Sequence, residues 1–382
     1  MIKLPGMEAV WAALPEARMV GGAVRDMLAG REVADVDFAS PLTPQEVMAR
    51  ARAAGLKAVP TGVEHGTVTL VAAGRGFEVT TLRRDVETDG RRALVAFTDD
   101  WREDAARRDF TINAMSCTQD GEIFDYFGGR EDLRAGIVRF VGAARLRIAE
   151  DYLRILRFFR FFARYGQSGP DAAAVAAIAQ EREGLRGLSA ERVWSEVKKI
   201  LAAPAPLAAV ELMRETGVLG IVLPGAKPAR LAALLARGAP VDPLLRVAAL
   251  TDEDLAVRLR LSGAEAEMLA GWRGTLALRP EDDDAALRRA LADVPVEVLT
   301  GRVWLWGGDG AGWAALRARL AAMERPVFAV QGRDLVALGV AAGPRMGEIL
   351  ALTRRWWLEG GCVADKAACL AWAGLMRGSA RY

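Results

Sequence analysis

Met19-Val20-Gly21-Gly22-Ala23-Val24-Arg25-Asp26 takes the chain from an apolar strand end, through two glycines, into a helical run. Glycines at such a strand-to-helix turn let backbone N–H groups approach a phosphate, and a helix N-terminus favours anions. Arg25, one turn into the helix, adds a cation that can reach a triphosphate oxygen. An ordinary Gly-Gly turn beside a surface arginine has the same pattern. Neighbouring motifs must therefore distinguish a phosphate-binding turn from an ordinary one.

Three carboxylates follow this turn. Asp35 and Asp37 alternate along an expected strand and point the same way, about 7 Å apart. Glu78 lies on a second expected strand, in Phe77-Glu78-Val79. Carboxylates so close repel one another unless cations lie between them, and Mg²⁺ prefers such oxygen ligands together with substrate phosphates. An Asp-x-Asp pair alone is also typical of a solvated strand end.

The combination resembles motif A of the class II tRNA nucleotidyltransferase and bacterial poly(A) polymerase family. Further segments resemble other parts of the family, in the same order along the chain. They are residues 107–115 (motif B, the ribose contact), 150–154 (motif D, the base reader), 191–201 (motif E) and 332–347 (the C-terminal tRNA-contacting segment).

The resemblance implies an α+β protein. Its nucleotidyltransferase head, polymerase β-like with a small mixed sheet, is expected over residues 1–138. An all-helical neck over 139–202 would bind nucleobase and RNA, and a helical body and tail over 203–382 would bind tRNA. The implied reaction is template-independent transfer of CMP and AMP to the tRNA 3′ end, with release of pyrophosphate.

The resemblance also implies residue roles. Asp35 and Asp37 would bind Mg²⁺, and Glu78 would position or deprotonate the attacking 3′-hydroxyl. The residues expected to bind the nucleotide are Gly21, Gly22, Arg25, Arg108, Asp109, Asn113, Asp151, Arg154 and Arg157. The expected partners are tRNA, CTP and ATP, in the cytoplasm, with the oligomeric state left open.

Asp151 and Arg154 also fit base reading on chemical grounds. Three residues apart, they would share one face of a helix. A carboxylate only accepts hydrogen bonds and a guanidinium only donates them, which suits the pairing edges of cytosine and adenine. Guanine and uracil present the reverse order, and their groups would be left unpaired. The alternative is a plain Asp–Arg helix pair.

A basic helix face is expected in the neck. Seven arginines and two acids lie between residues 139 and 164, and Arg157, Arg160 and Arg164 recur at helical spacing. This face either binds phosphate or is merely solvated. Four phenylalanines interleave with these arginines and are expected in the core: Phe158, Phe159, Phe161 and Phe162.

Local signals predict further elements. A helix is expected over 7–14, and another begins at Thr43-Pro44 and ends at Gly55. Residues 67–72 and 77–82 are expected to pair as a hairpin that carries Glu78 toward the aspartates. The charged segment 83–101 is interpreted as a mobile loop, and the chain after residue 145 as helical.

Composition favours a soluble intracellular protein. The 382 residues carry a net charge of +2, contain no stretch that resembles a membrane span, and are enough for two or three domains. The three cysteines have no metal or disulfide spacing and are expected to be buried thiols. The single histidine, His65, is interpreted as a loop residue, and its solitude excludes His-Asp phosphohydrolase chemistry. Residues 282–284 are interpreted as a helix-capping cluster.

Alternatives remain within and outside the family. Relatives commonly have Asp-x-Arg-His where this chain has Asp89-Gly90-Arg91-Arg92, a segment thought to help the switch from C to A addition. The family also contains poly(A) polymerases and enzymes that add only CC or only A, and these activities stay open as alternatives. A catalytically silent tRNA-binding protein is the alternative from another class.

Overall fold

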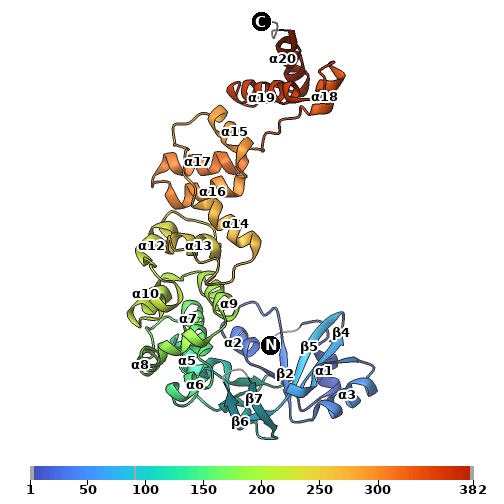
Figure 1. The fold of residues 1–382 in the computed structure, drawn as a ribbon. Helices are drawn as coiled ribbons and strands as arrows, with labels where there is room; N and C mark the ends of the chain where they lie inside the picture. Colours follow the sequence, from blue (N-terminus) through green and yellow to red (C-terminus); the bar gives the residue numbers. More distant parts are fainter. Residues whose placement is uncertain (1–3, 90–91, 379–382) are drawn as a thin grey trace. The chain divides into compact units, whose positions relative to one another are not determined.

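The computed structural model describes residues 4–89 and 92–378 (Figure 1). The chain divides into two compact units. The first is Met1–Ala226 and the second is Lys227–Tyr382. Both of the boundaries expected from the sequence, after residues 138 and 202, fall inside the first unit, and they stay a prediction.

A seven-stranded mixed sheet forms the centre of the N-terminal part, with strand order β3-β4-β5-β2-β1-β8-β9. Only β2 and β5 run parallel; the other neighbours are antiparallel. The strands are β1 (Arg18–Val20), β2 (Asp37–Ser40), β3 (Lys57–Gly62), β4 (Thr67–Ala72), β5 (Arg75–Thr81), β8 (Met115–Cys117) and β9 (Ile123–Asp125).

The predicted β4–β5 hairpin is confirmed, and its register matters for the carboxylates. In the parallel β2–β5 pair, Asp37 lies directly opposite Glu78. Directly opposed residues have side chains on the same face of a sheet. The observed strand is shorter than predicted, however. It begins at Asp37, so Asp35 precedes it.

The expected loop over residues 83–101 is wrong. The structure forms a separate two-stranded antiparallel sheet from β6 (Arg83–Asp89) and β7 (Arg92–Phe97), and α4 (Trp101–Ala106) follows. Backbone hydrogen bonds define such a ladder, so charged composition need not prevent it. Gly90 and Arg91, in the segment that departs from the family pattern, lie outside the described residues.

Helices make up the rest of the first unit (Figure 1). The expected N-terminal helix and the capped helix that begins after Thr43 are both confirmed. The helices, besides α4, are α1 (Met7–Ala13), α2 (Gly22–Leu28), α3 (Pro44–Ala53), α5 (Gly129–Ala135), α6 (Ala144–Glu150), α7 (Leu153–Tyr165), α8 (Ala172–Glu181), α9 (Ala190–Leu201), α10 (Leu207–Glu215) and α11 (Val218–Val222).

Aromatic packing joins α7 to the segment that follows α4. Phe110 pairs with Phe140 through a β-bridge, and their rings lie 4.8 Å apart. Phe161 meets the Phe110 ring edge-on at 5.2 Å, and Phe158 stacks on Phe140. Offset and edge-to-face aromatic pairs contribute about 0.5–1.5 kcal/mol beyond their buried area. This cluster fixes α7 against the residues that form the site described below.

The second unit is helical, as predicted, with its apolar side chains in three clusters. Asp283 caps α15 by accepting the Ala286 N–H at 2.7 Å, which confirms the capping role of residues 282–284. The helices are α12 (Pro228–Ala236), α13 (Pro243–Leu250), α14 (Gly263–Trp272), α15 (Asp284–Asp293), α16 (Val296–Trp306), α17 (Ala311–Ala322), α18 (Gly332–Ala337), α19 (Pro344–Glu359) and α20 (Lys366–Gly378).

The cysteines and the expected absence of a membrane span can be compared with the structure. Cys117, Cys362 and Cys369 are buried free thiols, as expected. Among the described residues, no helix is both long and apolar enough to cross a bilayer.

Candidate active site

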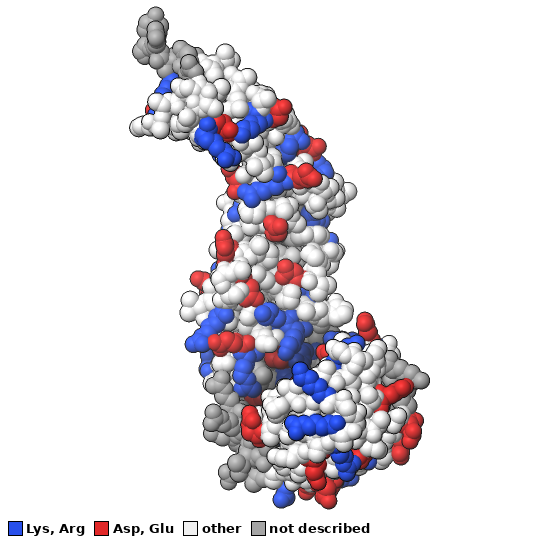
Figure 2. Space-filling model, turned by 90° about the vertical axis from the view of Figure 1, so that its right-hand side faces the viewer, with Lys and Arg blue, Asp and Glu red and all other residues white. Residues whose placement is uncertain are grey.

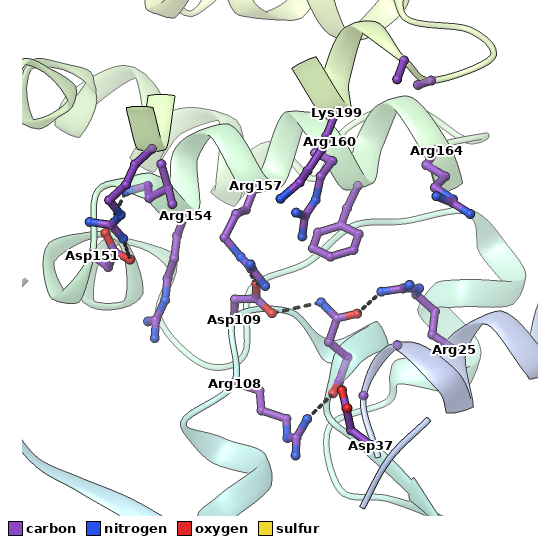
Figure 3. A pocket seen from close by; sticks show the side chains of 18 of the residues that line it. Arg25, Asp37, Arg108, Asp109, Asp151, Arg154, Arg157, Arg160, Arg164 and Lys199 are labelled. Atoms are coloured by element: carbon purple, nitrogen blue, oxygen red, sulfur yellow. Dashed lines mark hydrogen bonds and ion pairs between the residues drawn. The ribbon is translucent and has the colours of Figure 1, made fainter. Parts of the chain in front are cut away.

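A cavity of about 900 Å³ lies within the first unit, and Lys and Arg side chains gather around the hollow (Figures 2 and 3). Ten of the twelve predicted site residues line it, while Asp35 and Glu78 do not. The ten are Gly21, Gly22, Arg25, Asp37, Arg108, Asp109, Asn113, Asp151, Arg154 and Arg157.

The cavity is strongly cationic. Among the described residues that line it, nine are Lys or Arg and three are Asp. Most of these cations are held by an acidic partner, which fixes their side chains without cancelling the local excess of positive charge. A site with this charge favours a polyanion such as a nucleoside triphosphate.

The glycine turn and the helix after it give the cavity wall two glycines and one arginine held in place by hydrogen bonds. Gly21 has a φ of 65°, and a Cβ there would approach the Arg108 guanidinium to 3.0 Å. Only glycine fits this position without strain. Arg25, on α2, is buried, and its Nη1 donates to Asn113 Oδ1 at 2.5 Å. Asp26 accepts from the other side of the same guanidinium, at 3.0 and 3.1 Å.

Asp109 is the centre of a buried hydrogen-bond network (Figure 3). It accepts from Asn113 Nδ2 at 2.9 Å, from Arg157 Nε at 2.6 Å and from the Phe110 N–H at 2.9 Å. Burial alone would raise the pKa of Asp109, but the Arg157 charge and these hydrogen bonds hold that pKa below its usual value. Through Asn113, the network links Arg157 on α7 to Arg25 on α2.

Asp104 plays a similar part for the two arginines that follow α4. Arg107 Nη2 and Arg108 Nη2 lie 2.7 and 3.1 Å from its carboxylate. Burial of Asp104 opposes ionisation, yet the two guanidinium charges hold the pKa of this carboxyl below its usual range. Arg108 is thereby fixed at the cavity wall, as the predicted ribose contact requires.

The predicted common helix for Asp151 and Arg154 is wrong. Asp151 is extended and lies between α6 and α7, whereas Arg154 is in the first turn of α7. Asp151 instead accepts from Arg192 at 2.7 Å and from the Leu153 N–H, while Arg154 donates to Glu150 and to the Arg147 carbonyl. The bond from the Leu153 N–H to the Asp151 carboxylate, at 3.0 Å, is a local side-chain-to-backbone bond in the extended segment between α6 and α7, which residue spacing does not reveal.

Both side chains still line the cavity (Figure 3). Because separate partners hold them, they do not neutralise one another. A carboxylate has about four lone-pair sites and a guanidinium five N–H donors, so each keeps hydrogen-bonding capacity beyond the bonds described above.

The three carboxylates form a zone of negative potential around the start of β2, an interior strand of the sheet. Loss of solvation raises the pKa of Asp37, the Glu78 and Asp35 charges raise it further, and only Arg108 acts in the opposite sense. All three side chains keep solvent access. Within the described part of the chain, however, no three acidic, His or Cys side chains stand close enough to form a metal-ligand group.

Residue spacing missed part of the site. Arg192 and Lys199, on α9, line the cavity together with Arg160, which the sequence placed on the basic face of α7. Glu196 is buried and accepts from Arg160 at 3.0 Å and from Lys199 at 3.1 Å. The seven-residue spacing of Arg192 and Lys199 on one helix was the available signal.

Phe161 lines the cavity, contrary to a purely structural role in the core, whereas His65 does not line it. Phe161 is buried, as predicted, but it also lines the cavity, where the Arg160 guanidinium lies 4.5 Å from its ring centre. His65 is exposed in a 3₁₀ turn between β3 and β4, does not line the cavity, and accepts an Arg83 hydrogen bond through its carbonyl. This confirms its interpretation as a loop residue.

Comparison with known proteins identifies the family. Residues 17–139 match the poly(A) polymerase head domain, and residues 170–230 match the probable RNA- and SrmB-binding site of polymerase A. The mitochondrial CCA tRNA nucleotidyltransferase 1 of Danio rerio is 38% identical over 365 residues, which cover 90% of this chain and 83% of that protein. The chain belongs to the CCA-adding tRNA nucleotidyltransferase family.

Two further members of this family extend the similarity. The CCA-adding enzyme of Geobacillus stearothermophilus is 34% identical over 388 residues, which cover 94% of this chain and 92% of that enzyme. The crystal structure of the Bacillus stearothermophilus CCA-adding enzyme in complex with CTP matches with a TM-score of 0.72 and 29% identity, over 98% of both chains. The match therefore includes both units of this family member.

Proposed function

We propose that this chain transfers CMP and AMP from CTP and ATP to the 3′ end of tRNA, without a template, and releases pyrophosphate. The observation that carries the proposal is the cationic cavity of the first unit, which brings together the glycine turn, Asp37 and the Asp151 and Arg154 side chains. Family membership over nearly the whole chain supports the same reaction. The compartment stays a prediction, because the relatives named above include a mitochondrial protein and bacterial ones.

The cavity residues have distinct proposed roles. Arg25 and the Gly21–Gly22 backbone hold the triphosphate, and Arg108 and Asp109 hold the ribose. The 3′ oxygen of tRNA bonds to the α-phosphorus as the bond to pyrophosphate breaks, and Glu78 positions the attacking hydroxyl or accepts its proton. Positioning and fixed charges supply most of the rate enhancement in this class of reaction.

Magnesium fits the donor chemistry of the carboxylates around the start of β2. Asp35 and Asp37 would hold it, because oxygen ligands suit this cation, and loss of solvation together with the Glu78 and Asp35 charges raises the pKa of Asp37. When bound, Mg²⁺ would neutralise the charge that develops on the transferring phosphate. The chain's own contribution is to hold these oxygens at the start of β2, beside the glycine turn.

The direct test is incorporation on three transcripts: tRNA without CCA, tRNA ending in CC, and an unstructured RNA. Each receives Mg²⁺ with CTP, ATP or both. Addition of CCA that then stops is the expected result. A single A added only to the CC-ended tRNA would indicate an A-adding enzyme, and long A tails on unstructured RNA a poly(A) polymerase. No incorporation on any transcript would contradict the proposal.

Replacement of Arg154 by glutamine should weaken base selection more than triphosphate binding. We expect the preference for CTP over UTP to fall by about tenfold, because one charged hydrogen bond to the base is lost. The ratio of kcat/KM values for the two nucleotides measures this effect. Arg147→Gln is the matched control, because Arg147 also pairs with Glu150 but does not line the cavity. An unchanged ratio in Arg154→Gln would rule out base reading by this residue.

A further inference from the structure

A second, smaller cavity of about 280 Å³ lies in the first unit, where the ends of α2 and α7 meet α5. Arg31, Arg130 and Arg134 line it, together with Tyr165 and apolar side chains. Cavities that hold drug-sized ligands usually measure about 300–1,000 Å³. This cavity lies near the lower end of that range, and it has room for one or two phosphate groups.

The charges of this cavity are of one sign. None of its described lining residues is acidic. In the described part of the chain, neither Arg130 nor Arg134 forms an ion pair. Asp132, on the same helix, instead accepts a hydrogen bond from the Thr111 hydroxyl and pairs with Arg139. Three guanidinium groups gathered without a carboxylate repel one another and favour an anion between them. Guanidinium groups bind phosphate oxygens through paired N–H donors.

Tyr165 connects this cavity to the candidate active site. The Arg31 and Arg25 guanidinium groups each lie 4.6 Å from the centre of its buried ring. Its hydroxyl donates to Asp26, the same carboxylate that accepts two hydrogen bonds from Arg25. Arg31 is fixed from its other side by donating to the Arg164 carbonyl at 2.6 Å. Arg25 lines the large cavity, and Arg31 and Tyr165 line the small one.

We propose that the small cavity is a second phosphate-binding site, separated from the triphosphate-holding Arg25 by the Tyr165 side chain. The phosphate group comes either from the backbone of the bound tRNA or from free pyrophosphate. The site itself rests on the three arginines and the cavity, whereas the choice of these two probes rests on the proposed function. An anion that draws Arg31 away from Tyr165 would also act on the Asp26–Arg25 pair.

The first test uses the full chain with Arg130→Gln and Arg134→Gln combined. Both side chains are exposed, so the fold should be unaffected. The matched control is Arg52→Gln with Lys57→Gln, which removes two exposed positive charges from α3 and β3. Binding of a tRNA transcript without CCA is measured against KCl concentration. If the site takes a backbone phosphate, the slope of log K against log salt falls by about one to two in the cavity variant and stays unchanged in the control.

The second test measures the stoichiometry of labelled pyrophosphate binding in the absence of tRNA. If the site takes free pyrophosphate, the wild-type and control proteins bind two per chain and the cavity variant binds one. A cavity variant that matches the control in both tests overturns the proposal. Incorporation of CMP by the wild-type protein is recorded alongside. Its absence would reject the proposed function, while pyrophosphate stoichiometry still reports directly on the cavity.

Discussion

Replacement of Asp37 by alanine is expected to lower CMP and AMP incorporation by about a thousandfold or more, because several kcal/mol of transition-state stabilisation depend on the cation held there. Asp37 is the one carboxylate of the predicted three that lines the large cavity, and it lies opposite Glu78 in the parallel strand pair. Single-turnover incorporation on tRNA without CCA measures the loss.

The fold should survive this change. Asp37 lies directly opposite Glu78, and partial loss of solvation and the Glu78 and Asp35 charges raise the pKa of its carboxyl, so its removal relieves a repulsion. The thermal unfolding midpoint in EDTA should equal or exceed that of the wild-type protein. Asp120→Ala, an exposed acid in the turn between β8 and β9, is the control and should keep full activity. Substantial incorporation by Asp37→Ala would refute its catalytic assignment.

Replacement of Asp109 by asparagine is expected to lower the free energy of unfolding by about 2–3 kcal/mol. The change leaves the Arg157 guanidinium without its carboxylate and weakens the bonds from Asn113 and the Phe110 N–H. The loss stays below the 3–5 kcal/mol typical of a fully buried ion pair, because about a third of the Arg157 side chain is exposed to solvent. Denaturant titration at pH 7 measures the loss.

The same variant has a defined pH dependence. The pKa of Asp109 is lowered in the folded protein, so the stabilisation is fully present above the unfolded pKa and is lost as pH falls through the folded pKa. The difference in unfolding free energy between wild type and Asp109→Asn should therefore be constant near pH 7 and shrink below about pH 4. A difference that stays constant in acid would contradict a carboxylate-based network. Asp120→Asn again provides the control.

Catalysis should respond to Asp109→Asn as well. Asn113 bridges Asp109 to Arg25, so disorder in the network reaches the group proposed to hold the triphosphate. We expect KM to rise for CTP and ATP alike, without a change in the preference between them. That pattern differs from the one expected for Arg154→Gln, and steady-state kinetics with both nucleotides separates the two.

Much of the site was predictable because its signals are local. A positive φ at Gly21, the Thr43-Pro44 helix start and the alternating β4–β5 hairpin each depend on a few consecutive residues. The chain also has several family motifs in order, and they identified ten of the twenty described residues that line the cavity. The position of Asp35 was predicted less well, because β2 begins after this residue and does not include it.

Other features depend on partners distant in sequence. The residue spacing predicted that Asp151 shares a helix with Arg154. In the structure the Asp151 carboxylate instead accepts a hydrogen bond from Arg192, 41 residues later in the chain. The β6–β7 ladder replaced an expected loop because cross-strand backbone bonds can form regardless of charge. The part of Glu196 in holding Arg160 and Lys199 requires α7 and α9 to pack together.

The sequence by itself determined the family, the glycine turn, the β4–β5 hairpin and half of the residues that line the large cavity, because short motifs carry the local backbone and chemical requirements. Tertiary structure alone decided how the charges are paired. It set Asp109 between Asn113 and Arg157, and it placed the Tyr165 ring beside both Arg25 and Arg31. Hydrogen bonds and cation–π contacts act over a few ångströms, so they depend on which elements pack together and not on separation along the chain.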